Sequence, residues 1–342
     1  MKAVRFHEYG AADVLRYEDV PEPEPRSGEA LIRVRACAVN HVDIDMRRGI
    51  SRLPLALPHT LGFEITGEVA AVGDGVTEVA VGDRVSPLFQ IHCRECEWCR
   101  RGEHMHCERI EMLGVQRPGG YAEYALAPAW ALIELPDSLS YERAAAIQTT
   151  FATVWHALVS RVALAEGQWV LVNAAGSGVG TAGIQVARML GGRVLASAGS
   201  DEKLERAREL GAEAGVNYRT EDLATRVREL TDGRGVDVVM ESVGGDVMAG
   251  SIASLAKNGK VVTVGAHAGE VVPVDMILLF RNQWSVVGSV RATADEIRHV
   301  VDLVAEGKLD PVIHDVLPLE AASEAHRLME ERRQFGKVIL VP

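Results

Sequence analysis

Apolar and polar residues alternate along the first third of the chain. Ile32, Val34 and Ala36 alternate with arginines, which is the two-residue period of a strand with one buried face. Short apolar runs in this region are separated by Gly-Asp pairs, which favour tight turns. Residues 1–130 are therefore predicted to be rich in β-strands.

The pattern changes near residue 140, where apolar runs begin to alternate with longer amphipathic stretches. Ser140 is predicted to cap a helix over 144–158. A strand over 169–173 leads into a helix over 179–190, which two glycines end. Further strands are expected at 194–197, 216–218, 236–240, 261–265 and 285–290, and further helices at 202–210 and 295–306. This alternation predicts a doubly wound parallel sheet with right-handed crossovers.

Composition narrows the classes of function. The length of 342 residues suggests two domains, and an apolar fraction of 47% is enough to give each a core. The net charge is 36 − 48 = −12, which opposes a nucleic-acid or anionic-membrane partner because both require clustered positive charge. No run approaches ~20 apolar residues, so no membrane span is expected. We predict a cytoplasmic location with reduced thiols.

Four of the five cysteines lie in one short segment. Cys93, Cys96, Cys99 and Cys107 have the spacing C-x2-C-x2-C-x7-C, whereas Cys37 is distant in sequence. Four thiolates on a short loop are the donor set of a tetrahedral zinc site. The segment therefore predicts one bound zinc ion.

Three other interpretations of the cysteine segment are weaker. A disulfide scaffold is typical of small, cysteine-rich secreted domains, which this chain is not. An iron–sulfur loop of the bacterial type has a last gap of three residues followed by proline, whereas here the gap is seven and Glu108 follows. Four buried structural cysteines are disfavoured because charged residues fill the segment.

A turn of small residues follows the strand at 169–173. It reads Ala-Ala-Gly-Ser-Gly-Val-Gly over 174–180, and a helix comes next. Small residues at these positions let a pyrophosphate approach the N–H groups at the helix N-terminus. The turn thus predicts a dinucleotide site; the alternative is an ordinary strand–helix turn. The residues expected to contact the dinucleotide are Ser177, Gly178, Val179 and Gly180.

The end of the next strand bears on the choice of dinucleotide. It reads Ala-Gly-Ser over 198–200, with no carboxylate at the tip to accept from a ribose 2′-hydroxyl. Ser200 and Lys203 instead suit a 2′-phosphate, which requires donors and positive charge. The prediction is therefore NADP(H). The alternative is that Lys203 is a solvated helix residue, with Asp201 and Glu202 close by.

These motifs resemble those of the medium-chain dehydrogenase/reductase superfamily, which contains zinc alcohol dehydrogenases and quinone oxidoreductases. The matching segments span nearly the whole chain: 67–73, 82–85, 93–107, 119–124, 174–180, 198–200 and 336–338. The resemblance implies a GroES-like β-barrel catalytic domain and a Rossmann domain with a doubly wound parallel sheet, an α/β protein overall. It also implies a homodimer or homotetramer.

Domain boundaries follow from the same resemblance. The GroES-like catalytic domain is expected over 1–150 and 291–342, with a structural zinc lobe at 92–108. The Rossmann domain is expected over 151–290.

Zinc-dependent members of the superfamily bind a second, catalytic zinc. The resemblance places its ligands at Asn40, Phe63 and Thr149, none of which is a good zinc ligand. The hydroxyl residue that begins the alcohol proton relay corresponds to Val42, which has no proton to transfer. Quinone oxidoreductases of the superfamily also lack this zinc and carry Asn at the position of Asn40. The chain therefore resembles that subgroup, with the structural zinc lobe retained.

The resemblance also suggests roles for individual residues. Asn40 is expected to donate a hydrogen bond to the substrate oxygen, and Asp43 to order its loop; the alternative roles are structural. Thr149 is expected near the nicotinamide. Further cofactor contacts are expected from His41, Thr150, Tyr218 and Gly265. A solvated histidine, a back-bonding threonine and a packed tyrosine are the corresponding structural interpretations.

The resulting functional hypothesis is hydride transfer from NADPH to a conjugated carbonyl substrate. Quinones, enones and aldehydes are the candidate small molecules, since a hydrogen-bond donor can stabilise the negative charge that they develop. Two alternatives stay open. One is a zinc-type alcohol or aldehyde dehydrogenase with an atypical metal site, formed for example by Asp43, His59 and Glu64. The other is a non-enzymatic NADPH-binding sensor.

Overall fold

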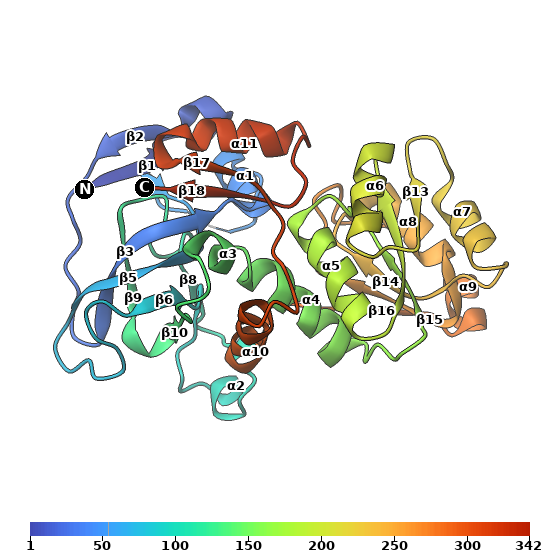
Figure 1. Ribbon diagram of the computed structural model, residues 1–342, viewed down its shortest axis with the longest axis horizontal. Coiled ribbons are helices and arrows are strands. Elements are labelled where there is room, and N and C mark those ends of the chain that lie inside the picture. Colours follow the sequence, from blue (N-terminus) through green and yellow to red (C-terminus); the bar gives the residue numbers. More distant parts are fainter. Residues whose placement is uncertain (54) are drawn as a thin grey trace. The chain divides into compact units, whose positions relative to one another are not determined.

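The structure is a computed structural model that describes residues 1–53 and 55–342. The chain forms two compact units, one of Met1–Ile147 with Val301–Pro342 and one of Gln148–Val300. The first break lies close to the boundary expected after residue 150, and the second lies ten residues beyond the boundary expected after residue 290. Figure 1 traces both units in sequence colours.

The first unit is built on a seven-stranded sheet in which β3 is central. Strand β3 pairs antiparallel with β5, β9 and the C-terminal strand β18. The strands of this sheet are β3 (Glu29–Ala38), β5 (Glu64–Val72), β6 (Arg84–Pro87), β9 (Tyr124–Pro128), β10 (Leu132–Glu134), β17 (Ile313–Pro318) and β18 (Lys337–Val341). The pairing of Ile339 with Ala38 attaches the last residues of the chain to this unit.

Smaller elements complete the first unit. Two further sheets contain β1 (Lys2–Phe6), β2 (Arg16–Asp19) and β4 (His59–Thr60), and β7 (Gln90–Ile91) with β8 (Glu111–Met112). Its helices are α1 (His41–Arg48), α2 (Glu97–Arg100), α3 (Tyr141–Ala145) and α11 (Ala322–Glu330). The apolar face of β3 lies in the core, where Ile32 packs with Phe6, Leu61 and Ile65.

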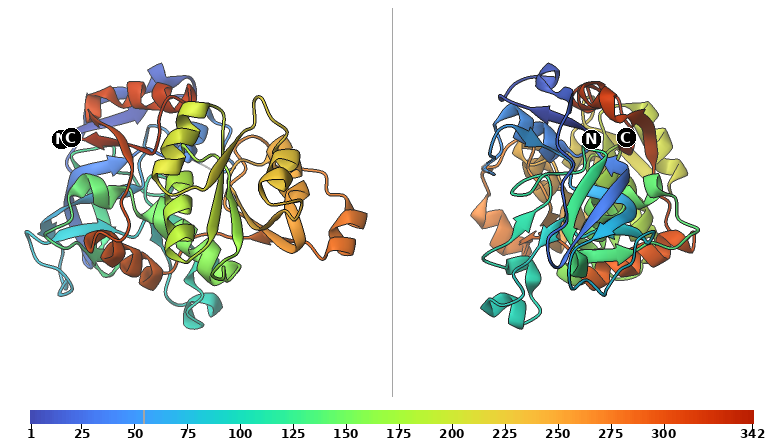
Figure 2. Two further views of the ribbon diagram at one scale, coloured as in Figure 1. Left: turned by 45° about the vertical axis from the view of Figure 1, so that its right-hand side comes forward. Right: turned by 90° about the vertical axis from the view of Figure 1, so that its left-hand side faces the viewer.

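The second unit contains a six-stranded parallel sheet with the order β13-β12-β11-β14-β15-β16. This unit is the green-to-orange part of the chain in Figures 1 and 2. Its strands are β11 (Trp169–Val172), β12 (Arg193–Ala198), β13 (Ala214–Asn217), β14 (Val236–Glu241), β15 (Leu255–Thr263) and β16 (Ser285–Gly288). Its helices are α4 (Thr153–Trp155), α5 (Gly178–Met189), α6 (Asp201–Glu209), α7 (Leu223–Leu230), α8 (Gly245–Ala253) and α9 (Met276–Asn282), and α10 (Ala294–Ala305) begins in it.

The strand order of this sheet reverses between β11 and β14. From β11 the chain winds outward through β12 to β13, and it then returns to the other side of β11. With right-handed crossovers, the helices before and after this reversal cover opposite faces of the sheet. A reversal of this kind opens a crevice at the carboxyl ends of the two central strands, which is where ligands bind in open α/β sheets.

The expected helix over 144–158 differs from the observed structure. The Ser140 side chain does accept from the Arg143 N–H, but the helix that it caps, α3, ends at Ala145. The following backbone forms wider π-type turns at Gln148–Ala152 and His156–Arg161, on either side of α4. The compact units divide between Ile147 and Gln148, so the helical pattern of the sequence spans the end of one unit and the start of the next.

Within the described part of the chain, no helix combines the length and the apolar character needed to cross a membrane.

Candidate functional site

The four cysteines of the predicted zinc lobe converge. The Sγ atoms of Cys93, Cys96, Cys99 and Cys107 all lie within 4.8 Å of one another, and those of Cys93 and Cys99 are 3.9 Å apart. A tetrahedron with zinc–sulfur bonds of ~2.3 Å has edges of about 3.8 Å. No disulfide joins these four residues. Their geometry and soft donor chemistry fit a zinc ion.

Local backbone geometry favours the thiolate form of Cys93, whereas burial raises the pKa of Cys99 to about 12. The Cys93 sulfur accepts from the Cys96 N–H at 3.3 Å, and the Cys107 sulfur accepts from the Cys93 N–H at 3.3 Å. Hydrogen bonds from the Glu95 and Cys96 amides lower the pKa of Cys93 to about 6, in spite of an opposing desolvation. A low pKa favours metal binding because the thiolate is the form that binds.

A second polar cluster in the same unit surrounds Asn40, and it contains a buried cation. The Lys337 ammonium donates to Asn40 Oδ1 at 2.7 Å, to Glu64 Oε2 at 2.8 Å and to the Val39 carbonyl at 3.1 Å. The Glu64 side chain is 1% exposed and that of Lys337 is 7% exposed. The charge of each partner is therefore balanced by the other, and all three N–H groups of the ammonium have acceptors.

Both polar atoms of the Asn40 side-chain amide have hydrogen-bond partners. While Oδ1 accepts from Lys337, Nδ2 donates to Glu64 Oε2 at 3.1 Å and to the Ala38 carbonyl at 3.3 Å. The amide orientation follows from these partners, since an ammonium only donates and a carbonyl only accepts. Donation from Asn40 to a substrate, as expected from the sequence, requires Nδ2 to exchange one of these acceptors.

Asp43 is fully buried beneath the Asn40 loop. Its carboxylate accepts from the Asn40 N–H at 2.8 Å, from the Gly62 N–H at 3.3 Å and from the Tyr121 hydroxyl. Burial raises the pKa of this carboxyl to about 7, although the Asn40 hydrogen bond and the charge of Lys337 oppose the rise. These contacts are those that a loop-ordering role requires.

A chain of buried side chains behind Asp43 was not predicted from the sequence. Arg47 Nη1 lies 3.2 Å from His326 Nδ1, and His326 Nε2 lies 3.1 Å from the Tyr121 hydroxyl. Because a guanidinium only donates, His326 Nδ1 must accept and Nε2 must carry the proton. The Tyr121 hydroxyl thus accepts a hydrogen bond from His326 Nε2 and donates its own to the Asp43 carboxylate. Burial and the charge of Arg47 lower the pKa of His326 to about 3, so the ring is neutral at pH 7.

The alternative metal site of Asp43, His59 and Glu64 is not supported by the geometry. Among the described residues, these three side chains form no cluster of candidate metal ligands. His59 Nε2 lies 2.8 Å from the Gly114 carbonyl, to which it can only donate, so this nitrogen has no lone pair for a metal. The other two carboxylates are committed to the contacts given above.

The glycine-rich turn of the second unit has the geometry expected of an anion site. Helix α5 begins at Gly178, and Ser177 caps it by accepting from the Gly180 N–H at 2.9 Å. A Cβ on Gly180 would lie 2.2 Å from the Ala174 carbonyl oxygen, so only glycine allows this close turn. The N–H groups of Gly178 and Val179 point out of the first turn of the helix, where the dipole favours an anion.

The tip of β12 brings together the residues expected to contact an adenosine phosphate. Ser200 caps α6 and accepts from the Lys203 N–H at 3.4 Å. A Cβ on Gly199 would lie 2.8 Å from the Tyr218 hydroxyl and 3.1 Å from Arg219 Nε. Arg219 therefore adds a cation that sequence reasoning missed, although its place directly after Tyr218 was a usable signal.

The other predicted contacts lie on segments whose local structure is clear. His41 is the first residue of α1 and is half-buried. Thr149 and Thr150 lie in the π-type turn of Gln148–Ala152, a backbone form that is frequent at functional sites. The Gly265 carbonyl accepts from the Thr263 hydroxyl at 3.2 Å, just beyond β15.

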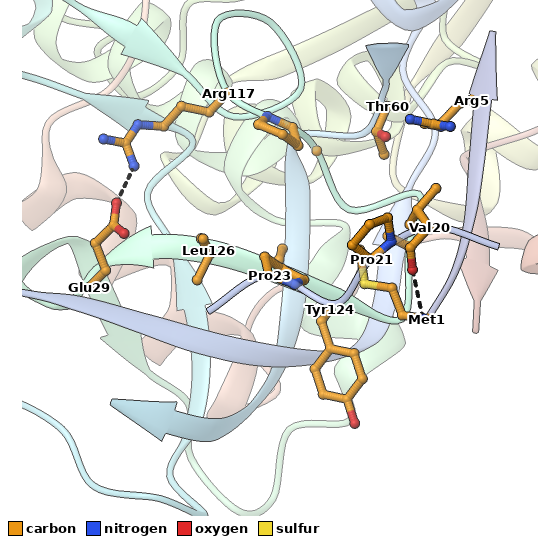
Figure 3. Close-up of a pocket in the computed structure, with 14 residues that line it drawn as sticks. Met1, Arg5, Val20, Pro21, Pro23, Glu29, Thr60, Arg117, Tyr124 and Leu126 are labelled. Atoms are coloured by element: carbon orange, nitrogen blue, oxygen red, sulfur yellow. Dashed lines mark hydrogen bonds and ion pairs between the residues drawn. The ribbon is translucent and has the colours of Figure 1, made fainter. Parts of the chain in front are cut away.

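One pocket of about 280 Å³ lies in the first unit, apart from these residues (Figure 3). Its lining is mainly apolar, and its polar groups have partners: Arg117 pairs with Glu29 at 3.0 Å, and the Met1 amine donates to the Val20 carbonyl at 2.9 Å. None of the predicted site residues lines it. It is therefore not the candidate active site.

Comparison with known proteins agrees with both units. Residues 26–137 match the alcohol dehydrogenase GroES-like domain, and residues 178–306 match the zinc-binding dehydrogenase family. An alcohol dehydrogenase of Geobacillus stearothermophilus is 34% identical over 95% of this chain and 96% of its own length. The human quinone oxidoreductase is 31% identical over 100% of this chain and 98% of its own. A solved structure named NAD-dependent alcohol dehydrogenase is 44% identical, with a TM-score of 0.95 and complete coverage of both chains.

The two folds and the dinucleotide turn define an NAD(P)-dependent oxidoreductase, as the sequence predicted. The chain belongs to the medium-chain dehydrogenase/reductase family, among the zinc-type alcohol dehydrogenases and quinone oxidoreductases. The expected combination of a GroES-like domain with a Rossmann-like parallel sheet is confirmed.

Proposed function

We propose that this protein transfers hydride from NADPH to a conjugated carbonyl compound without a catalytic metal. The observation that carries the proposal is the Lys337 ammonium, which is bonded to both Asn40 and Glu64. A dication beside this ammonium would be repelled in a medium of low dielectric. Phe63, at the position of a zinc ligand in metal-dependent relatives, is a buried apolar side chain that packs against Phe89 with ring centroids 5.2 Å apart.

The bound dinucleotide would supply the hydride. The N–H groups of Gly178 and Val179 would bind its pyrophosphate, and Ser177 would hold the turn in the binding conformation. When an enone or quinone accepts hydride at carbon, the product is an enolate whose negative charge lies largely on oxygen. This enolate is then protonated by water. Asn40 Nδ2 would exchange the longer of its two contacts, that to the Ala38 carbonyl, for this oxygen.

Lys337 and Asp43 would act through Asn40. Lys337 polarises the amide by donating to Oδ1, which makes the Nδ2 protons more acidic and strengthens donation to an oxyanion. Asp43 accepts from the Asn40 backbone N–H and so fixes the start of α1. The expected positions of Thr149 and Thr150 near the nicotinamide, and the expected cofactor contacts of His41 and Gly265, remain part of this proposal.

NADPH is proposed over NADH because of the tip of β12. Asp201, the nearest carboxylate in sequence, accepts from Asn217 Nδ2 at 2.8 Å. Arg219 and the Ser200 hydroxyl provide the charge and donors that a 2′-phosphate requires, together with Lys203 and Tyr218. Steady-state rates with both dinucleotides test this directly; faster turnover with NADH would contradict the assignment.

A zinc-type alcohol dehydrogenase is the second candidate, because the Geobacillus relative is named alcohol dehydrogenase and the 44% identical structure NAD-dependent alcohol dehydrogenase. In that case a second metal would be required, and metal content would be about two per chain rather than one. We assign the zinc of Cys93, Cys96, Cys99 and Cys107 a structural role, since four protein thiolates leave no position open for substrate.

A homodimer is proposed from an apolar surface of the second unit. Met276, Ile277 and Phe280 of α9 are 64%, 55% and 63% exposed, and Val286 on the edge strand β16 is 46% exposed. An edge strand offers unpaired backbone groups, and a second copy can cover both these and the apolar side chains. Light scattering would test it: the wild type should be dimeric, and Phe280→Glu should yield monomer.

The experiment that tests the proposed reaction is a turnover panel. NADPH oxidation is followed with quinones, enones and aldehydes, and dinucleotide reduction with simple alcohols. The proposal expects conjugated acceptors to be reduced and simple alcohols to be inert. Turnover of alcohols alone, or tight NADPH binding with no turnover of any substrate, would contradict it.

A further inference from the structure

The two strands that flank the reversal of the parallel sheet end in side chains that are bonded to each other. Asn173 follows β11, and Glu241 is the last residue of β14. Asn173 Nδ2 donates to Glu241 Oε2 at 2.6 Å, and the Ser197 hydroxyl of β12 donates to Asn173 Oδ1 at 2.6 Å. A buried polar network therefore lies directly at the crevice where the dinucleotide is proposed to bind.

The Glu241 carboxylate is fully buried, and its hydrogen-bond donors are neutral. Oε2 accepts from Asn173 Nδ2 and from the Ser251 hydroxyl, both at 2.6 Å. Oε1 accepts from the Val243 N–H at 2.5 Å and from the Gly244 N–H at 3.1 Å. Each oxygen thus faces two donors, an arrangement that suits a carboxylate because an ionised carboxylate only accepts hydrogen bonds.

This carboxylate fixes the backbone that leaves β14. Gly244 and Gly245 follow it with φ of 74° and 53°, a conformation that side-chain-bearing residues avoid. The same segment binds the loop that leaves β15: the Ala268 N–H donates to the Val243 carbonyl at 2.8 Å, and the Gly245 N–H donates to the Gly269 carbonyl at 3.0 Å. Glu241 therefore holds two loops at once.

The sheet order indicates which half of the dinucleotide these loops face. The adenosine phosphate is proposed at the tip of β12, and the pyrophosphate at the turn after β11. Continuing in the same direction across the sheet, the nicotinamide half must lie over the carboxyl ends of β14 and β15. Those ends carry the two loops that Glu241 holds.

We propose that Glu241 is a positioning residue for the nicotinamide half of the bound dinucleotide. The inference rests on the proposed function, since it requires a dinucleotide at this crevice. Glu241 touches neither the reacting carbon nor the substrate in this account; it acts by holding the loops after β14 and β15 in the conformation that receives the ring.

The test compares Glu241→Gln with wild type in the full chain. Glutamine has the same shape, but its NH₂ group would face an N–H donor whichever way it is turned: Asn173 Nδ2 on one side, or the Val243 and Gly244 N–H groups on the other. Binding of NADPH is measured by calorimetry beside binding of 2′,5′-ADP, which contains only the adenosine half. We expect NADPH to bind about tenfold more weakly and 2′,5′-ADP to bind as in wild type.

Two further variants complete the design. Glu213→Gln makes the same chemical change at an exposed ion pair with Arg193 and should alter neither affinity. Ser251→Ala removes one neutral donor to Glu241 and should weaken NADPH binding about threefold. This variant replaces Glu241→Gln in the test if Glu241→Gln does not fold.

The outcomes separate this inference from the proposed function. Equal weakening of NADPH and 2′,5′-ADP would mean that the whole unit is destabilised, and unchanged affinity for both would mean that the loops do not depend on Glu241; either result overturns the inference alone. Wild-type protein that binds neither ligand would overturn the proposed function, and the inference with it.

Discussion

The cysteine lobe and the Asn40 cluster are two polar sites in one unit, and they differ in how charge is balanced. The lobe gathers four sulfur donors within 4.8 Å and places one cation, Arg109, at 3.5 Å from Cys93. The Asn40 cluster gathers an amide and a carboxylate around an internal ammonium. The first site requires a metal to balance its thiolates, whereas the second is balanced by Lys337 itself. We therefore propose that the cysteine lobe binds a zinc ion and that the Asn40 cluster binds none.

The largest effect is expected from removing a zinc ligand. Cys96→Ser or Cys99→Ser should abolish zinc binding and unfold or dissociate the protein, because zinc binding to such sites contributes on the order of 10 kcal/mol to folding. Zinc content and thermal unfolding provide the measurement. Cys37→Ala is the matched control, since this buried cysteine lies outside the lobe and its loss should leave the zinc in place. A Cys96 variant that stays folded and loses only turnover would contradict the structural role.

Breaking the internal ion pair should have the next largest effect. Lys337→Met leaves the Glu64 carboxylate buried without its cation, which should lower the free energy of unfolding by about 3–5 kcal/mol. The double variant Lys337→Met with Glu64→Gln removes both charges and should recover most of this loss. Urea unfolding of the two variants and wild type measures it. If the single variant is as stable as wild type, the charge of Glu64 is balanced by something other than Lys337.

A pH dependence is expected from Asp43. Its pKa is raised to about 7, so the carboxyl that accepts from the Asn40 and Gly62 N–H groups is fully ionised only above neutral pH. Below this value the carboxyl is protonated and loses acceptor capacity, so kcat/KM should fall about tenfold per pH unit toward acid. Asp43→Asn should lower activity and flatten this limb of the profile.

Tyr121→Phe sharpens the same prediction. It removes one donor to the carboxylate while keeping the ring in the core, so the pKa of Asp43 should rise and the acid limb should move to higher pH. An acid limb that is unchanged in both variants would show that another group titrates.

The smallest effect is expected from restoring a single zinc ligand. Phe63→His places an imidazole at a position where metal-dependent relatives carry one, yet Lys337 still occupies the cluster. Zinc content should therefore stay at about one ion per chain. A gain of a second zinc in this variant would mean that the internal ammonium does not exclude a dication.

Local patterns in the sequence were sufficient to predict much of the fold and the convergence of the four cysteines. The period of residues 32–36, the spacing of the four cysteines and the small residues of 174–180 each act over a few residues, and the corresponding structures formed as expected. The π-type turns after residue 147 were not predictable from the helical period, because nothing in the sequence marks where a turn takes in an additional residue.

The contacts that define the Asn40 cluster were beyond sequence reasoning for a different reason. Lys337 is 273 residues from Glu64, and Tyr121 is 205 residues from His326. Nothing near either residue in sequence indicates its partner, since only the pairing of β18 with β3 and the packing of α11 bring them together. Glu241 was missed similarly, because a carboxylate with neutral donors has no opposite charge to signal it.

The most direct test of the central claim is the zinc content of the active protein, measured by mass spectrometry together with NADPH turnover of a conjugated acceptor. We expect about one zinc per chain, lost in Cys96→Ser, and turnover that added zinc does not increase. Two zinc ions per chain, or turnover that rises in proportion to a second bound metal, would contradict it.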